Sequence, residues 1–96
     1  MNIARPPGGF KVSLSAGARA LIRHHCEQSE LFERHWNDIV ERLRFVAHIE
    51  GVADSRFAKG CRLWAAAADE EHGLPRVKLV YLILDDRMTI KVAAIG

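Results

Sequence analysis

The end of the chain constrains the fold more than any other stretch. Residues 77–84 form an apolar run rich in β-branched and aromatic side chains, and a second such run covers residues 88–95. Asp85, Asp86 and Arg87 separate the two runs. Two runs of this kind joined by a short polar turn predict an antiparallel β-hairpin. Each run is too short to cross a bilayer as a helix, which needs about 20 apolar residues.

The composition is that of one globular domain. The chain has 96 residues, of which 49% are hydrophobic and 27% are charged, so a modest core can form without a stapling metal or disulfide. The formal net charge is only +2, with 14 Lys and Arg against 12 Asp and Glu. This balance does not indicate a protein whose whole surface binds nucleic acid. A local basic face is still compatible with it.

The two cysteines and the N-terminal segment predict where the protein resides. Cys26 and Cys61 have no paired spacing, which favours a reducing, cytoplasmic setting. The N-terminus lacks an apolar core of signal-peptide length, so we expect no export signal. Residues 1–9 contain adjacent prolines and glycines and are expected to form a flexible lead-in to a domain at residues 10–96.

Helical periodicity occupies the middle of the chain. Apolar residues repeat with helical spacing over residues 16–28 and, more strongly, over residues 30–50. Ser13 or Ser15 can cap the first helix, and Ser29 can cap the second. Gly51 is a natural stop for the second helix. The two helices are therefore expected to form an antiparallel hairpin.

The remaining strands are assigned from shorter patterns. Residues 10–14 alternate apolar and polar side chains, as in a half-buried strand. Residues 61–67 fit either a strand or a short helix, and we favour a strand, followed by a loop at residues 69–75. With the hairpin at 76–84 and 88–95, the order is β-α-α-β-β-β. The fold class is α+β, with the two-helix hairpin packed on one face of a small antiparallel sheet.

The periodicities also predict which side chains form the core. The expected set combines the apolar stripes of both helices with inward-facing strand residues: Phe10, Val12, Leu21, Ile22, Phe32, Trp36, Ile39, Val40, Leu43, Leu79 and Val92.

The element order and several short motifs together resemble the RelE/ParE toxin superfamily of bacterial toxin–antitoxin systems. The resemblance spans residues 10–96, and the final strand ends in Ile-Gly, as it often does in the family. The segments that carry it are residues 10–15, 36–47, 55–60, 63–64, 78–81 and 90–96.

The resemblance implies a cytoplasmic, bacterial or phage toxin that inhibits growth and is neutralised by a cognate antitoxin. The activity it implies is inhibition of translation by an mRNA interferase, a ribosome-dependent endoribonuclease that binds ribosome-bound mRNA. The site would be atypical, because Ala65 and Ala67 stand where RelE-type ribonucleases carry cations. The alternatives are a non-catalytic RelE-like protein-binding module and a ParE-like gyrase inhibitor, and a homodimer is a further option.

Cations and one histidine near the predicted sheet are the candidate site residues. RNA cleavage by 2′-hydroxyl attack needs charge stabilisation at the phosphate and groups that transfer protons. Strand alternation places Arg76 and Lys78 on one face, where they would stabilise phosphate charge, or would be ordinary solvent-facing residues. His72 is the candidate proton donor or acceptor, because imidazole titrates near neutral pH. The candidate nucleic-acid contacts are Arg56, Lys59 and Arg62.

No metal or other cofactor is expected. His24, His25 and Cys26 with Cys61 contain zinc-ligand types, but adjacent ligands on a helix point in different directions. Trp36 and Trp64 are interpreted as core residues rather than as platforms for stacking bases. No membrane association is expected.

Overall fold

The computed structural model describes residues 5–53, 56 and 58–96. Its elements follow in the order β1 (Lys11–Leu14), α1 (Ala16–Gln28), α2 (Glu30–Glu50), β2 (Val52–Ala53), β3 (Arg62–Ala66), β4 (Val77–Leu84) and β5 (Arg87–Ile95). The predicted α+β class, both helices and all four predicted strands are confirmed. β2 was not predicted.

Serine side chains begin both helices. Ser15 Oγ accepts a hydrogen bond from the Ala18 amide at 3.2 Å, and Ser29 Oγ accepts one from the Phe32 amide at 3.1 Å. Each bond satisfies one of the amide groups that a helix start leaves without an intrahelical partner. Ser29 also ends α1, so the helix hairpin turns at a single residue.

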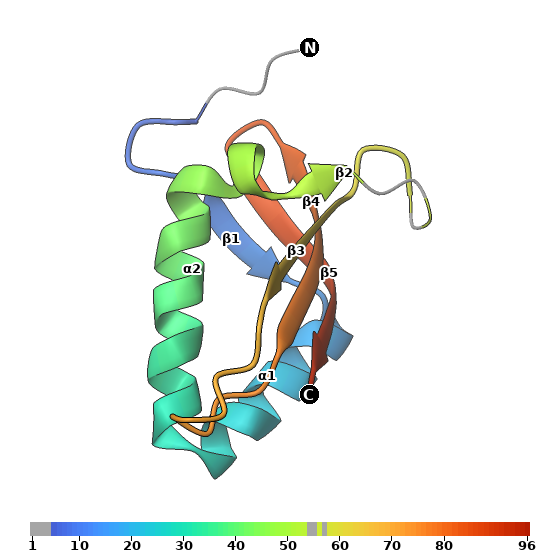
Figure 1. The fold of residues 1–96 in the computed structure, drawn as a ribbon. Helices are drawn as coiled ribbons and strands as arrows, with labels where there is room; N and C mark the ends of the chain where they lie inside the picture. Colours follow the sequence, from blue (N-terminus) through green and yellow to red (C-terminus); the bar gives the residue numbers. More distant parts are fainter. Residues whose placement is uncertain (1–4, 54–55, 57) are drawn as a thin grey trace.

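The five strands form one sheet in the order β1-β5-β4-β3-β2 (Figure 1). β1 pairs in parallel with β5, while the other neighbouring strands are antiparallel. The sheet is therefore mixed rather than wholly antiparallel. The parallel pair arises because the helix hairpin and the later strands lie between β1 and β5 in the chain, and β5 then runs beside β1 in the same direction.

A bulge in the β4–β5 pair corrects one predicted core position. The register shifts between Val80 and Tyr81, so that Tyr81 pairs with Ile90 whereas Val80 pairs with Val92. Lys91 is the extra residue, and an extra residue reverses the alternation of side chains beyond it. Val92 consequently faces away from the helices and is 46% exposed, so its assignment to the core was wrong.

Both helices pack on the sheet face that carries the inward side chains of β4. Val77, Leu79, Tyr81 and Ile83 belong to one buried cluster with residues of α1, α2 and β5. Of the predicted core, Phe10, Ile22, Phe32, Trp36, Ile39, Leu43 and Leu79 are buried, and Val12 and Val40 pack partly buried against the cluster. Leu21 is half-buried.

A buried tyrosine joins the sheet to the end of α2. The Tyr81 hydroxyl donates a hydrogen bond of 2.6 Å to the Ala47 carbonyl oxygen. Gly51 lies against the same ring, and a Cβ added there would stand 2.8 Å from Tyr81 Cζ and closer still to the hydroxyl. The position therefore requires glycine for lack of space, since its φ of −69° suits any residue.

The segment before β1 is attached to α2. Arg44 donates a hydrogen bond of 2.8 Å to the Gly8 carbonyl oxygen, and the Phe10 amide donates one of 2.7 Å to the Arg44 carbonyl oxygen. The Arg5 guanidinium lies 5.5 Å from the centre of the Phe45 ring. Neither helix in the described part of the chain is long and apolar enough to span a membrane.

Candidate functional site

The sheet has a second face that no helix of the described residues covers, which we call the open face. β4 contributes Lys78, Val80, Leu82 and Leu84 to it by alternation. The cross-strand neighbours are Leu63 and Ala65 on β3 and Arg87, Thr89, Val92 and Ala94 on β5. Leu84 is 65% exposed, so this face presents apolar surface to solvent.

Two of the predicted catalytic residues lie on or beside the open face. Lys78 and Arg76 are exposed, whereas Val77 and Leu79 are fully buried, which confirms the predicted alternation. Lys78 lies between Ala65 and Ala94 on the neighbouring strands. It makes no ion pair with any described residue, so its ammonium group is available to a ligand.

The third predicted catalytic residue is bound within its own loop. His72 Nδ1 lies 2.8 Å from Asp69 Oδ2, and backbone hydrogen bonds between Asp69 and Leu74 close the loop. The hydrogen bond from His72 lowers the pKa of the Asp69 carboxyl group. Potential ligand atoms of Asp69, Glu71 and His72 lie within 4.8 Å of one another, but all three side chains are exposed. Exposed groups of this kind are common without a metal.

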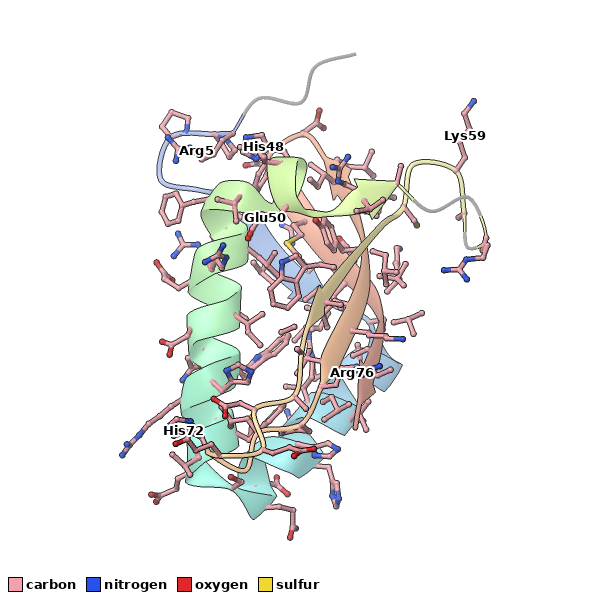
Figure 2. All side chains as sticks on the ribbon, in the orientation of Figure 1. Arg5, His48, Glu50, Lys59, His72 and Arg76 are labelled. Carbon is pink, nitrogen blue, oxygen red and sulfur yellow. The ribbon has the colours of Figure 1, made fainter. Side chains whose placement is uncertain are left out.

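The three predicted nucleic-acid contacts have different surroundings. Lys59 is exposed in the connection between β2 and β3, at the end of the molecule opposite His72 (Figure 2). Arg56 is exposed but takes part in an interaction. Arg62 is partly buried, and its guanidinium donates to the Gly51 carbonyl oxygen. Ser55 and Phe57 of the same motif lie outside the described residues.

These positions do not form one constellation. Arg76 and Lys78 are close because one residue separates them at the start of β4. His72 and Lys59 lie at opposite ends of the domain (Figure 2), and the Arg62 guanidinium is directed to the end of α2. The individual roles assigned to these residues stay predictions.

A groove between α2 and β3 is a second candidate site. It has a volume of about 750 Å³ and is lined on the helix side by His35, Asp38, Ile39 and Arg42. Residues 63–66 of β3 line the opposite side, with Glu50 and Val52 at one end. Trp64, interpreted from the sequence as core, is half-buried at this wall.

The charges in the groove are unevenly balanced. Arg42 Nε donates to Glu50 Oε1 at 2.6 Å, and this bond lowers the pKa of Glu50 while a contact with the Trp64 side chain lowers it further. Asp38 is exposed and has no ion pair or hydrogen bond to another described side chain. His35 Nε2 is buried without a hydrogen-bond partner among the described residues.

The residues that line this groove were not predicted from the sequence. The signal was the spacing of His35, Asp38, Ile39 and Arg42, which places them on one face of a helix. Nothing local in the sequence indicates that this face looks onto the edge of β3.

Searches of protein-family models, curated proteins and solved structures found no match to this chain.

Proposed function

We propose that this chain is a RelE/ParE-like, toxin-type domain that inhibits a cellular protein by binding it through the open face, and that a cognate antitoxin neutralises it. In this mode the chain is a protein-binding inhibitor, of which a ParE-like gyrase inhibitor is one form.

The observation that carries this proposal is the chemistry of the open face. Leu84 and Val92 are 65% and 46% exposed, and the flanking Ala65 and Ala94 add no charge beside Lys78. Two exposed apolar side chains on one sheet face suit a protein partner better than a polyanion. A phosphate-binding surface would instead present several cations together, whereas Arg87 lies opposite Leu84, at the far end of β4 from Lys78.

The placement of the only predicted proton-transfer residue supports the same choice. General acid–base catalysis requires the group to lie within hydrogen-bond reach of the reacting atoms, directly or through one water. His72 is held by Asp69 in an exposed loop, whereas Lys78 lies within β4.

The second candidate function is cleavage of ribosome-bound mRNA. The neighbouring exposed cations Arg76 and Lys78 favour it, because they can contact consecutive phosphate oxygens from one strand. In this alternative the ribosome supplies the surroundings that the isolated chain lacks.

Induction of the chain in bacteria separates the two candidates. We expect wild-type protein to arrest growth without new 5′ ends in ribosome-bound transcripts, and His72→Ala to arrest growth equally. The nuclease alternative predicts cleaved transcripts and relief of arrest by His72→Ala, because loss of a general acid or base costs about 10²–10⁴ in rate. Wild-type protein that does not slow growth would contradict the inhibitory role itself.

The antitoxin part of the proposal has its own test. Co-expression with the adjacent open reading frame should give a stable complex that purifies as one species. Failure of each neighbouring product to co-purify would contradict neutralisation by an antitoxin and leave the binding of a target as a separate question.

A further inference from the structure

The outer edge of β3 is only partly paired. β2 covers Arg62 and Leu63, whereas Trp64, Ala65 and Ala66 have no strand on this side among the described residues. On the other side, all five residues of β3 pair with β4. Backbone amide and carbonyl groups on the outer side of residues 64–66 are therefore available to a further strand.

This edge lacks the residues that normally prevent strand pairing. Residues 63–68 read Leu-Trp-Ala-Ala-Ala-Ala and contain neither a charge nor a proline. Soluble proteins commonly protect exposed edges with lysine, proline or a bulge. The opposite edge of the sheet has such protection, since β1 begins with the exposed Lys11, which pairs with Asp86 at 3.3 Å.

The groove lies directly beside the unpaired edge. Trp64 and Ala66 face it from β3, and Ile39 faces it from α2. Alternate side chains of a strand added to β3 would enter the groove, while the intervening ones would continue the open face. The edge and the groove thus form one surface with backbone and side-chain contacts for an extended segment.

We propose that an extended segment of a second polypeptide adds to the outer edge of β3, with apolar side chains at alternate positions in the groove and a Lys or Arg beside Asp38. The cation follows from charge, because Arg42 and Glu50 neutralise each other and Asp38 has no ion-pair partner among the described residues. This inference deepens the proposed function by assigning a surface, distinct from the open face, to a polypeptide partner.

A second copy of the chain fits this surface less well. Its own unpaired strand residues, Trp64 to Ala66, carry no cation that could reach Asp38. The adjacent Arg62 donates to Gly51 and is not available. Self-association through β3 is therefore an outcome that the experiment must exclude.

The test uses a displayed library of random peptides of about twelve residues, selected against the full chain. Selected peptides should show alternating apolar residues with a Lys or Arg toward one end. Hydrogen exchange of the complex should show amide protection gained at residues 64–66. Peptides without this pattern, protection confined to other strands, or no selected peptide at all would overturn the proposal.

Matched variants test the assigned surface with a selected peptide made synthetically. Ala66→Lys places a charge in the groove and should weaken binding at least about tenfold. Ala20→Lys is the control, since Ala20 is exposed on α1, outside both the groove and the open face. Equal affinity of these two variants would overturn the proposal, as would a wild-type dimer that Ala66→Lys dissociates.

A charge reversal provides a second variant at an exposed helix position. Asp38→Lys should weaken the binding of a cation-bearing peptide. It should leave the circular dichroism unchanged, because Asp38 is exposed and makes no hydrogen bond or ion pair to a described residue. An unchanged affinity would refute the charge assignment. The peptide selection does not involve a cellular target, so its failure is distinguishable from a failure of growth arrest.

Discussion

The contact between Tyr81 and the end of α2 gives the sharpest prediction of stability. Tyr81→Phe removes the donor of the 2.6 Å hydrogen bond and leaves the Ala47 carbonyl oxygen without it in a buried position. Loss of one partner of a buried hydrogen bond costs about 1–3 kcal/mol. For a domain of this size each 1 kcal/mol lowers Tm by roughly 4–8 °C.

Gly51→Ala tests the same contact from the other side. The new methyl group would overlap the Tyr81 hydroxyl, and overpacking of this kind costs about 1–3 kcal/mol. In the Tyr81→Phe background the hydroxyl is gone, so part of the overlap is relieved. The double variant should therefore lose less stability than the sum of the single variants, by about 1 kcal/mol.

Urea unfolding of the wild type, both single variants and the double variant measures this coupling. A fully additive double variant, or a Tyr81→Phe protein as stable as wild type, would refute the packing described for the end of α2.

Three further stability predictions follow from the helix face, the helix start and the buried tyrosine. Leu43→Ala and Trp36→Ala should each lower the free energy of unfolding by about 2–5 kcal/mol in urea titrations, and an unchanged midpoint would show that the face of α2 is misassigned. Ser29→Ala should lower it by about 1 kcal/mol, because the bond to the Phe32 amide is lost; Ser29→Gly should cost less. Burial raises the pKa of the Tyr81 hydroxyl above its ordinary value of 10.0. The contribution of neutral Tyr81 to the free energy of unfolding is therefore fully present below pH 10.0 and is lost as pH rises through the higher pKa of the folded state. Thermal midpoints of wild type should therefore fall in strongly alkaline solution relative to Tyr81→Phe, and an equal fall would contradict the role of Tyr81.

The elements were predictable where one pattern is repeated locally. The stripe from Phe32 to Ala47 identifies α2, and the capping serines mark where both helices begin. The apolar runs around the turn at 85–86 identify β4 and β5. In each case the preference of the local residues for helix or strand agrees with the structure that forms.

What was missed depends on contacts between distant segments. β2 contains only Val52 and Ala53 and exists because Leu63 and Arg62 lie beside it. The sequences of β1 and β5 do not indicate that these two strands pair in parallel. Lys91 gives no local sign of a bulge, so simple alternation assigned Val92 to the wrong face.

The candidate site was only partly predictable for the same reason. Alternation correctly placed Arg76 and Lys78 on the solvent side of β4. Sequence spacing cannot show that the Arg62 guanidinium donates a hydrogen bond to the Gly51 carbonyl oxygen, or that Asp38 faces a groove beside β3. Those facts require the tertiary arrangement of α2 against the sheet edge.

Growth of bacteria expressing Leu84→Glu, compared with the matched variant Leu31→Glu, tests the role of the open face most directly. Leu84 is 65% exposed on this face and Leu31 is 56% exposed on α2, so neither change removes core packing. Circular dichroism and expression level should be equal for the two variants. We expect Leu84→Glu to relieve growth arrest and Leu31→Glu to arrest growth like wild type. Full arrest by folded Leu84→Glu would contradict inhibition through the open face.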